Sequence, residues 1–216
     1  MSSFSPQTHL RDVPIIPSQA VLVVIDIQNF CSHKNGGQWK QAPPGSGAPS
    51  DYYWKTLDEV VLPNISMLQT CCRKAGVEVM FVVMESLTVD GRDRSLDYKI
   101  SGFNIPRGSW DAQVLDVIKP IGDEMVISKT SSSAFVSTNI DYVLRNMGKK
   151  QIVIVGGLTD QCVESAVRDA CDLGYLVTLV PDACITVSAE RQSRTLDTIK
   201  GYCRYRSADE LAAELS

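Results

Sequence analysis

Short, continuously apolar runs alternate along this chain with longer segments in which apolar residues recur at helical spacing. We predict strands from the apolar runs at residues 20–25, 77–84, 125–127, 151–155 and 175–180. Helical periodicity predicts helices near residues 57–75, 110–118, 138–147, 163–173 and 189–200. A short strand at 202–205 and a closing helix from Ala208 complete the pattern.

The predicted strands are apolar throughout and do not alternate with polar positions. This is the pattern of a parallel sheet that is covered by helices on both faces. We therefore expect an α/β fold, a three-layer α/β/α sandwich with a mainly parallel sheet. The length of 216 residues suits one such domain over residues 1–216, with residues 1–18 as an N-terminal extension.

Two long connections interrupt the alternation, at residues 28–51 and 86–109. The first contains the sequence QAPPGSGAPS at 41–50, too rich in Pro and Gly to be regular, and the second is polar and charged. Long loops in a compact domain are usually lids or binding loops, although a plain surface excursion is the alternative.

Composition narrows the classes of partner. A hydrophobic fraction of 44% and a net charge of -4 are ordinary for a globular protein and give no electrostatic case for nucleic acid. The N-terminus lacks a secretory signal and no apolar run is long enough for a bilayer, so we expect a cytoplasmic protein without membrane contact, with signal-independent export left open. Seven cysteines without paired CxxC spacing favour reduced thiols over disulfides or a zinc site.

Three polar residues follow the predicted strands at their carboxyl ends. Asp26 follows VLVVI, Lys129 follows MVIS, and Cys162 lies just beyond QIVIV and a glycine turn, where a helical pattern begins. Ligands of parallel sheets bind at this edge, so the three side chains are expected to share it. A thiol at a helix N-terminus also meets unpaired backbone N–H groups and the positive end of the helix dipole.

These residue types suit nucleophilic catalysis. A thiol is only a few per cent ionised at neutral pH, so it needs a base, which Asp26 supplies, and a cation that favours thiolate, which Lys129 supplies. Singly, each has an ordinary structural explanation as a turn residue, a surface charge or a packed thiol. Their joint placement predicts an active site.

The chain also resembles a known family, the isochorismatase-like hydrolases or cysteine hydrolases, over about residues 21–186. The resemblance rests on IDIQNF at 25–30, SKTSSSAF at 128–135, GGLTDQCVES at 156–165 and PDAC at 181–184. It implies a doubly wound sheet, a catalytic triad of Asp26, Lys129 and Cys162, and a cis peptide between Gly157 and Leu158. It further implies an oxyanion hole formed by the N–H groups of Leu158 and Cys162, and a homodimer or homotetramer.

Four further residues are candidates for binding a small-molecule substrate. Phe30 and Gln28 follow the expected base, and Phe30 resembles a family position that lines the pocket, although a core Phe is a comparable alternative. Phe135 has the same two interpretations. Arg92 could receive a substrate carboxylate, although mixed charges usually mark a solvated loop.

We expect neither a metal nor a cofactor. The related nicotinamidases bind a metal through an Asp and two His after the first strand. This chain has only His9 and His33, and the corresponding SDYYW offers Asp51 without a histidine nearby.

Three functions remain open. The leading one is hydrolysis of a small amide, carbamoyl or ureido compound through a Cys162 thioester. The alternative is cleavage of the vinyl ether of isochorismate to a dihydroxybenzoate and pyruvate, with Asp26 as the acid. A third is a redox-sensing thiol or a binding protein, which would leave Asp26 and Lys129 unexplained.

Overall fold

A six-stranded sheet forms the centre of the structure, a computed structural model that describes residues 8–40 and 51–216. All neighbouring strands pair in parallel, in the order β3-β2-β1-β4-β5-β6. The strands are β1 (Ala20–Ile25), β2 (Glu78–Met84), β3 (Met125–Lys129), β4 (Gln151–Gly157), β5 (Leu176–Ile185) and β6 (Arg204–Tyr205). The predicted parallel α/β sheet is confirmed.

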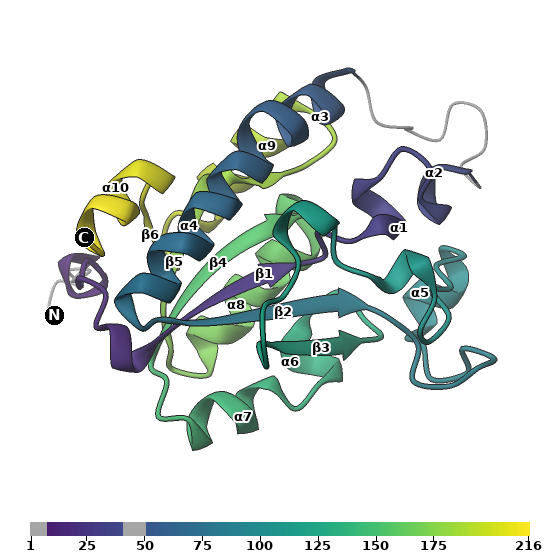
Figure 1. Ribbon diagram of the computed structural model, residues 1–216, viewed down its shortest axis with the longest axis horizontal. Coiled ribbons are helices and arrows are strands. Elements are labelled where there is room, and N and C mark those ends of the chain that lie inside the picture. Colours follow the sequence, from purple (N-terminus) through teal and green to yellow (C-terminus); the bar gives the residue numbers. More distant parts are fainter. Residues whose placement is uncertain (1–7, 41–50) are drawn as a thin grey trace, which may run out of the picture.

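Helices cover both faces of this sheet (Figure 1). One face carries α3 (Asp51–Thr56), α4 (Leu62–Ala75) and α10 (Ala208–Glu214). The other carries α6 (Ala134–Ser137), α7 (Ile140–Asn146), α8 (Glu164–Asp172) and α9 (Ala189–Ile199). Three short helices, α1 (Asn29–Ser32), α2 (Gly37–Lys40) and α5 (Leu96–Ile100), lie beyond the carboxyl ends of β1 and β2.

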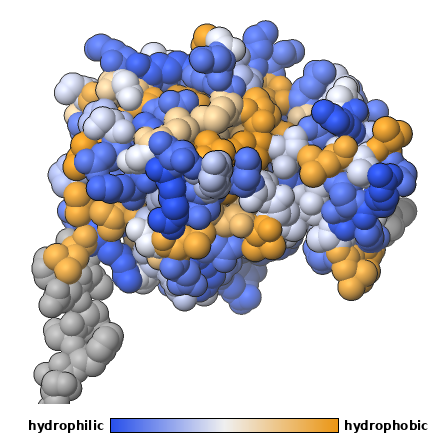
Figure 2. Space-filling model, turned by 90° about the horizontal axis from the view of Figure 1, so that it is seen from below, coloured by the Kyte–Doolittle hydropathy of each residue, from blue (hydrophilic) through white to orange (hydrophobic). Residues whose placement is uncertain are grey.

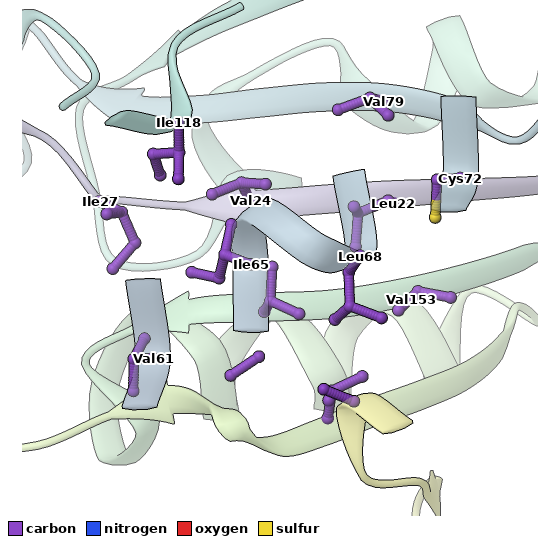
Figure 3. Close-up of a cluster of buried hydrophobic side chains, with 14 of the residues drawn as sticks. Leu22, Val24, Ile27, Val61, Ile65, Leu68, Cys72, Val79, Ile118 and Val153 are labelled. Atoms are coloured by element: carbon purple, nitrogen blue, oxygen red, sulfur yellow. The ribbon is translucent and has the colours of Figure 1, made fainter. Parts of the chain in front are cut away.

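The strands are continuously apolar because each face buries alternate residues. In β1, Leu22 and Val24 pack against α4, whereas Val21 and Val23 face the core that α7 and α8 cover. Figure 3 shows the α4 side, where side chains from α4 interlock with those of β1, β2 and β4. Burial of each aliphatic side chain contributes about 1.5–3 kcal/mol, so this core fixes the strands whose ends carry the polar residues.

The strand order reverses between β1 and β4. From this pair the chain proceeds outward to β2 and β3 on one side and to β5 and β6 on the other. The sheet is therefore doubly wound, and the crevice beyond the carboxyl ends of β1 and β4 is the place where such folds bind ligands.

One predicted helix is wrong. Residues 110–118 form two 3₁₀ turns, Trp110–Ala112 and Asp116–Ile118, separated by an extended stretch. Val114 in that stretch makes an antiparallel bridge with Gln28, and Leu115 N–H donates to the Ile27 carbonyl. Backbone pairing with the chain that leaves β1 therefore outweighs the helical spacing of the apolar residues.

The described parts of the two long connections contain short helices. The first contains α1 and α2, while its Pro- and Gly-rich stretch at 41–50 lies outside the described residues. The second contains α5. Figure 2 shows that apolar side chains lie among hydrophilic ones at the end of the molecule that this second connection forms. Among the described helices, none has the length and apolar character that crossing a membrane requires.

Candidate active site

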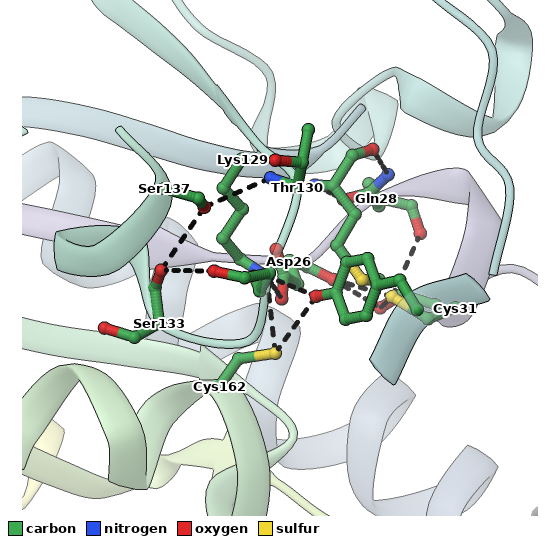
Figure 4. Close-up of polar contacts among 12 residues, drawn as sticks. Asp26, Gln28, Cys31, Lys129, Thr130, Ser133, Ser137 and Cys162 are labelled. Carbon is green, nitrogen blue, oxygen red and sulfur yellow. Dashed lines mark hydrogen bonds and ion pairs between the residues drawn. The ribbon is translucent and has the colours of Figure 1, made fainter. Parts of the chain in front are cut away.

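The three polar residues predicted at the strand ends meet at one point (Figure 4). Asp26 directly follows β1, Lys129 is the last residue of β3, and Cys162 lies in the helical turn after β4. Lys129 Nζ is 2.9 Å from Asp26 Oδ2 and 3.4 Å from Cys162 Sγ. The parallel sheet thus brings together side chains at or just beyond the ends of three strands.

All three side chains are shielded from solvent. The exposed fraction is 0% for Lys129, 2% for Asp26 and 5% for Cys162. Burial acts to lower the pKa of Lys129, but the charge of Asp26, together with Cys162 and Tyr98, outweighs burial and holds that pKa well above its ordinary value. The amine is therefore an ammonium ion at neutral pH.

Burial has the opposite effect on the two acids of the cluster. It raises the pKa of Asp26, although the Lys129 ammonium opposes the change. It also raises the pKa of the Cys162 thiol to about 12 against the pull of Lys129. The sequence-based expectation that Lys129 favours thiolate is thus outweighed by burial, and the resting sulfur carries its proton.

The backbone of Asp26 adopts the left-handed region, with a φ of 54°. Its N–H donates to the Val82 carbonyl at 2.9 Å, and its own carbonyl accepts the Cys31 thiol at 2.8 Å. Such a conformation persists only where neighbouring groups enforce it, and here it turns the carboxylate toward Lys129.

Tyr98 belongs to the same cluster and was missed in the sequence. Its hydroxyl accepts a hydrogen bond from Lys129 Nζ at 3.0 Å and lies 4.0 Å from Cys162 Sγ. Ser95 caps α5 by accepting from the Tyr98 N–H, and the Ser95 N–H donates to the Thr130 carbonyl. These bonds fix α5 beside the end of β3.

Cys162 follows the end of β4, which packs tightly against β1. Gly156 has a φ of 124°, and a Cβ on it would lie 2.1 Å from the Ile25 carbonyl oxygen, so only glycine fits. The peptide between Gly157 and Leu158 is cis. The chain then forms a π-helical turn, Thr159–Val163, that continues into α8. Cys162 accordingly lies in the first turn of this helical segment.

A cavity of about 320 Å³ opens onto this cluster. Asp26, Leu158 and Cys162 line its inner end. The two long connections supply other walls, with Cys31 and Gln38 from the first and Asp97, Tyr98, Ser101 and Phe103 from the second. The sulfur, the carboxylate and the residue of the expected oxyanion hole therefore face a common space large enough for a small molecule.

Two predicted substrate-binding residues near Asp26 make contacts within the protein. Gln28 is fully buried, and its amide donates to the carbonyls of Met84 and Asp111 and accepts from the Met84 N–H. These hydrogen bonds join the segment after β1 to the end of β2, and they occupy both the nitrogen and the oxygen of the Gln28 amide. Phe30 is buried edge-to-face against Phe103, behind the cavity wall.

The other two predicted contacts also lie away from the cavity. Phe135 packs near Tyr175 among the residues that cover the α8 face of the sheet. The Arg92 side chain is 73% exposed and pairs with Asp90 at 3.0 Å. Neither residue is among the described residues that line the cavity.

No group of three or more His, Cys, Asp or Glu side chains is arranged to hold a metal ion within the described residues. The cluster itself holds a fixed cation, Lys129, next to its carboxylate and thiol.

The fold and the position of the cavity define the chain as a doubly wound α/β protein with its site at the switch point of the sheet. A family model for the isochorismatase domain matches residues 20–208. The chain belongs to the isochorismatase family, and it is a hydrolase of that family.

Individual relatives agree with this assignment. The chain is 28% identical over 187 residues to ureidoacrylate amidohydrolase RutB of Rhizobium rhizogenes, covering 79% of this chain and 72% of the relative. A cysteine hydrolase from Pseudomonas syringae pv. phaseolicola has a similar structure, with a TM-score of 0.79, 22% identity and coverage of 94% and 95%. N-carbamoylsarcosine amidase from Thermoplasma acidophilum matches with a TM-score of 0.69, 23% identity and coverage of 89% and 98%. The two structures show the shared fold.

Proposed function

We propose that this protein hydrolyses a carbon–nitrogen bond in a small amide, carbamoyl or ureido compound, with Cys162 as the nucleophile. One observation carries the proposal. A thiol, a carboxylate and an ammonium group, each at or just beyond the end of a separate strand, lie within hydrogen-bonding reach at the inner end of a cavity. A neutral thiol beside a buried carboxylate is suited to transfer its proton as the sulfur attacks.

In the first half of the reaction, Cys162 Sγ attacks the carbonyl carbon while Asp26 accepts the thiol proton. The C–S bond forms and the carbonyl electron pair moves to oxygen. Collapse of this tetrahedral intermediate breaks the C–N bond, and Asp26 returns the proton to the departing nitrogen. An acyl group then remains on the sulfur as a thioester.

In the second half, a water molecule attacks the thioester carbon and Asp26 accepts one of its protons. The C–S bond breaks, the sulfur regains a proton and the acid product leaves. Lys129 remains protonated throughout, because its pKa is held well above neutrality. Its ammonium orients Asp26 and stabilises negative charge on the sulfur during both halves.

Negative charge on the substrate oxygen needs donors of its own. We infer that the backbone N–H groups of Leu158 and Cys162 supply them, since both residues line the cavity beside the sulfur. Preorganised donors of this kind contribute about 2.7–4 kcal/mol each to stabilisation of the transition state.

The names of relatives support the reaction class. Ureidoacrylate amidohydrolase and N-carbamoylsarcosine amidase are both named for cleavage at carbon–nitrogen bonds. Their particular substrates are not carried over, since the identities are 28% and 23%.

The test is a panel of small amides, ureido acids and carbamoyl compounds, with release of ammonia or amine as the readout. The wild type should turn over members of the panel and Cys162→Ala should not. Cys71→Ala, which changes a partly exposed thiol of α4, should match the wild type. Pyruvate release from isochorismate without hydrolysis of any amide would refute the proposal and favour vinyl-ether cleavage.

A further inference from the structure

We propose that the cavity selects substrates by charge. It favours small amides that carry a cationic group at a distance from the reacting carbonyl, and the Asp97 carboxylate is the partner of that group. It disfavours anionic compounds. The identity of these molecules as amides rests on the proposed function. The selection by charge rests on the side chains of the cavity alone.

The charges around the cavity do not cancel. Asp26 at the inner end is balanced by Lys129 at 2.9 Å, which leaves Asp97 at the mouth as an unbalanced carboxylate. Of the described residues that line the cavity, none is a Lys, Arg or His. Its other polar side chains, such as Gln38, Ser132 and Gln161, are uncharged. The formal charge of the lining with Lys129 included is therefore negative.

Three cations of the neighbouring loop contact other groups of that loop. Lys99 Nζ donates to the Arg92 carbonyl at 2.8 Å, and Arg92 itself pairs with Asp90. Arg94 donates to the carbonyls of Gly91 and Phe103. The stretch QAPPGSGAPS at 41–50, outside the described residues, contains no Lys, Arg or His in its sequence. Among the described residues that line the cavity, a substrate carboxylate would thus find no cationic partner.

The Asp97 carboxylate is free to receive a ligand. It is exposed in the first turn of α5, and within the described part of the chain no ion pair or side-chain hydrogen bond occupies it. Asp97 lines both the cavity and a shallow groove next to it. Arg168 also lines this groove, and its guanidinium is paired with the Glu164 carboxylate at 2.8 Å. A substrate that extends from Cys162 toward the groove would pass Asp97.

The size of the effect follows from the exposure of Asp97. Attraction between a solvated carboxylate and a cation is modest, and repulsion of an anion is of similar size. Together they give a preference for cation over anion of about tenfold at low salt, which should shrink as the ionic strength rises.

The test uses Cys162 itself as the reporter. Methanethiosulfonate reagents of similar size, one carrying a trimethylammonioethyl group and one a sulfonatoethyl group, react by the same step. The thiolate attacks the sulfenyl sulfur, a new S–S bond forms and methanesulfinate leaves. The labelling rate at Cys162 is measured by peptide mass spectrometry, which distinguishes Cys162 from the partly exposed Cys71 and Cys171. Each rate is then divided by the rate of the same reagent with 2-mercaptoethanol, so that differences in intrinsic reactivity cancel.

We expect the normalised rate at Cys162 to be about tenfold higher for the cationic reagent. Asp97→Asn should remove most of this difference. Asp116→Asn, which makes the same change in net charge at an exposed carboxylate outside the cavity, should preserve it. Equal rates, a faster anionic reagent, a preference that survives Asp97→Asn, or no labelling of Cys162 by either reagent would overturn the inference.

Hydrolysis is measured separately with matched amides that carry an ammonium, no charge or a carboxylate. If none is hydrolysed, the proposed function fails, while the labelling ratio still decides the selection by charge. If the carboxylate compound is hydrolysed fastest, the proposed function stands and the charge inference fails.

Discussion

Lys129 Nζ lies 2.9 Å from Asp26 Oδ2, and both side chains are buried at the carboxyl edge of the sheet. Removing two charges from water is unfavourable, and their mutual attraction offsets this only while both are present. The pair should therefore be sensitive to the loss of either member.

Asp26→Asn leaves the ammonium buried without a counter-charge, and Lys129→Met leaves the carboxylate in the same position. Each change should lower the free energy of unfolding by about 3–5 kcal/mol. The double variant should lose less than the sum of the two, because it buries no lone charge. Chemical denaturation of the four proteins measures this coupling, and strictly additive losses would show that the two groups do not interact.

The same variants separate stability from chemistry. Asp26→Asn removes the group that moves protons, so its turnover should fall by about 10²–10⁴-fold, and the double variant should not recover it. Recovery of stability without recovery of activity is the expected signature. Activity that returns with stability would assign Asp26 a purely structural role.

Alkylation of Cys162 should depend steeply on pH. Burial raises the pKa of this thiol to about 12, so raising the pH through the range 7 to 10 removes the proton from a growing but small fraction of the protein. The rate with iodoacetamide, which requires thiolate, should rise about tenfold per pH unit without levelling off. A free thiol with a pKa of about 8.5 levels off above that pH and serves as the control. A plateau near neutral pH would mean that Lys129 holds a thiolate at rest.

Tyr98→Phe removes the hydroxyl that accepts from Lys129 Nζ at 3.0 Å. Tyr98 acts through Lys129, so turnover should fall by about tenfold with little change in KM, and the dependence of turnover on pH should shift. Tyr175→Phe is the matched control, because it loses a hydrogen bond of 2.8 Å to Asp141 away from the cavity. If the two changes affect turnover equally, Tyr98 contributes only to the stability of the fold and has no specific role at Lys129.

Gly156→Ala places a Cβ 2.1 Å from the Ile25 carbonyl oxygen, directly before Asp26. The clash and the φ of 124° should together destabilise the fold by about 3 kcal/mol or more. Gly174→Ala isolates the second effect, because Gly174 has a φ of 91° with open space around it, and it should cost only about 1–2 kcal/mol. Similar losses in thermal unfolding would show that the approach of β4 to β1 tolerates a side chain.

The position of Asp26, Lys129 and Cys162 could be predicted from sequence because it depends on the strands. A buried strand must be apolar along its length, so the polar residue that ends it is conspicuous, and parallel pairing places such ends together. The doubly wound sheet follows from the same pattern and from the resemblance to the family.

Tyr98 and the cavity walls could not be predicted in this way. They depend on α5, a helix of one turn whose position is set by the bond between the Ser95 N–H and the Thr130 carbonyl. The amide of Gln28 is bound to the backbone of Met84, a long-range contact that leaves no periodic signal in the sequence. Residues on loops acquire their roles from such tertiary contacts.

The most direct test of the account is to trap the acyl-enzyme. An amide that the protein hydrolyses is mixed with it, the reaction is stopped with acid during turnover, and the peptide that contains Cys162 is analysed by mass spectrometry. We expect the acyl group of the substrate to be attached to Cys162 and to no other cysteine, and Cys162→Ala to show neither adduct nor turnover. Undiminished turnover in Cys162→Ala, or an acyl group carried by a different residue, would contradict it.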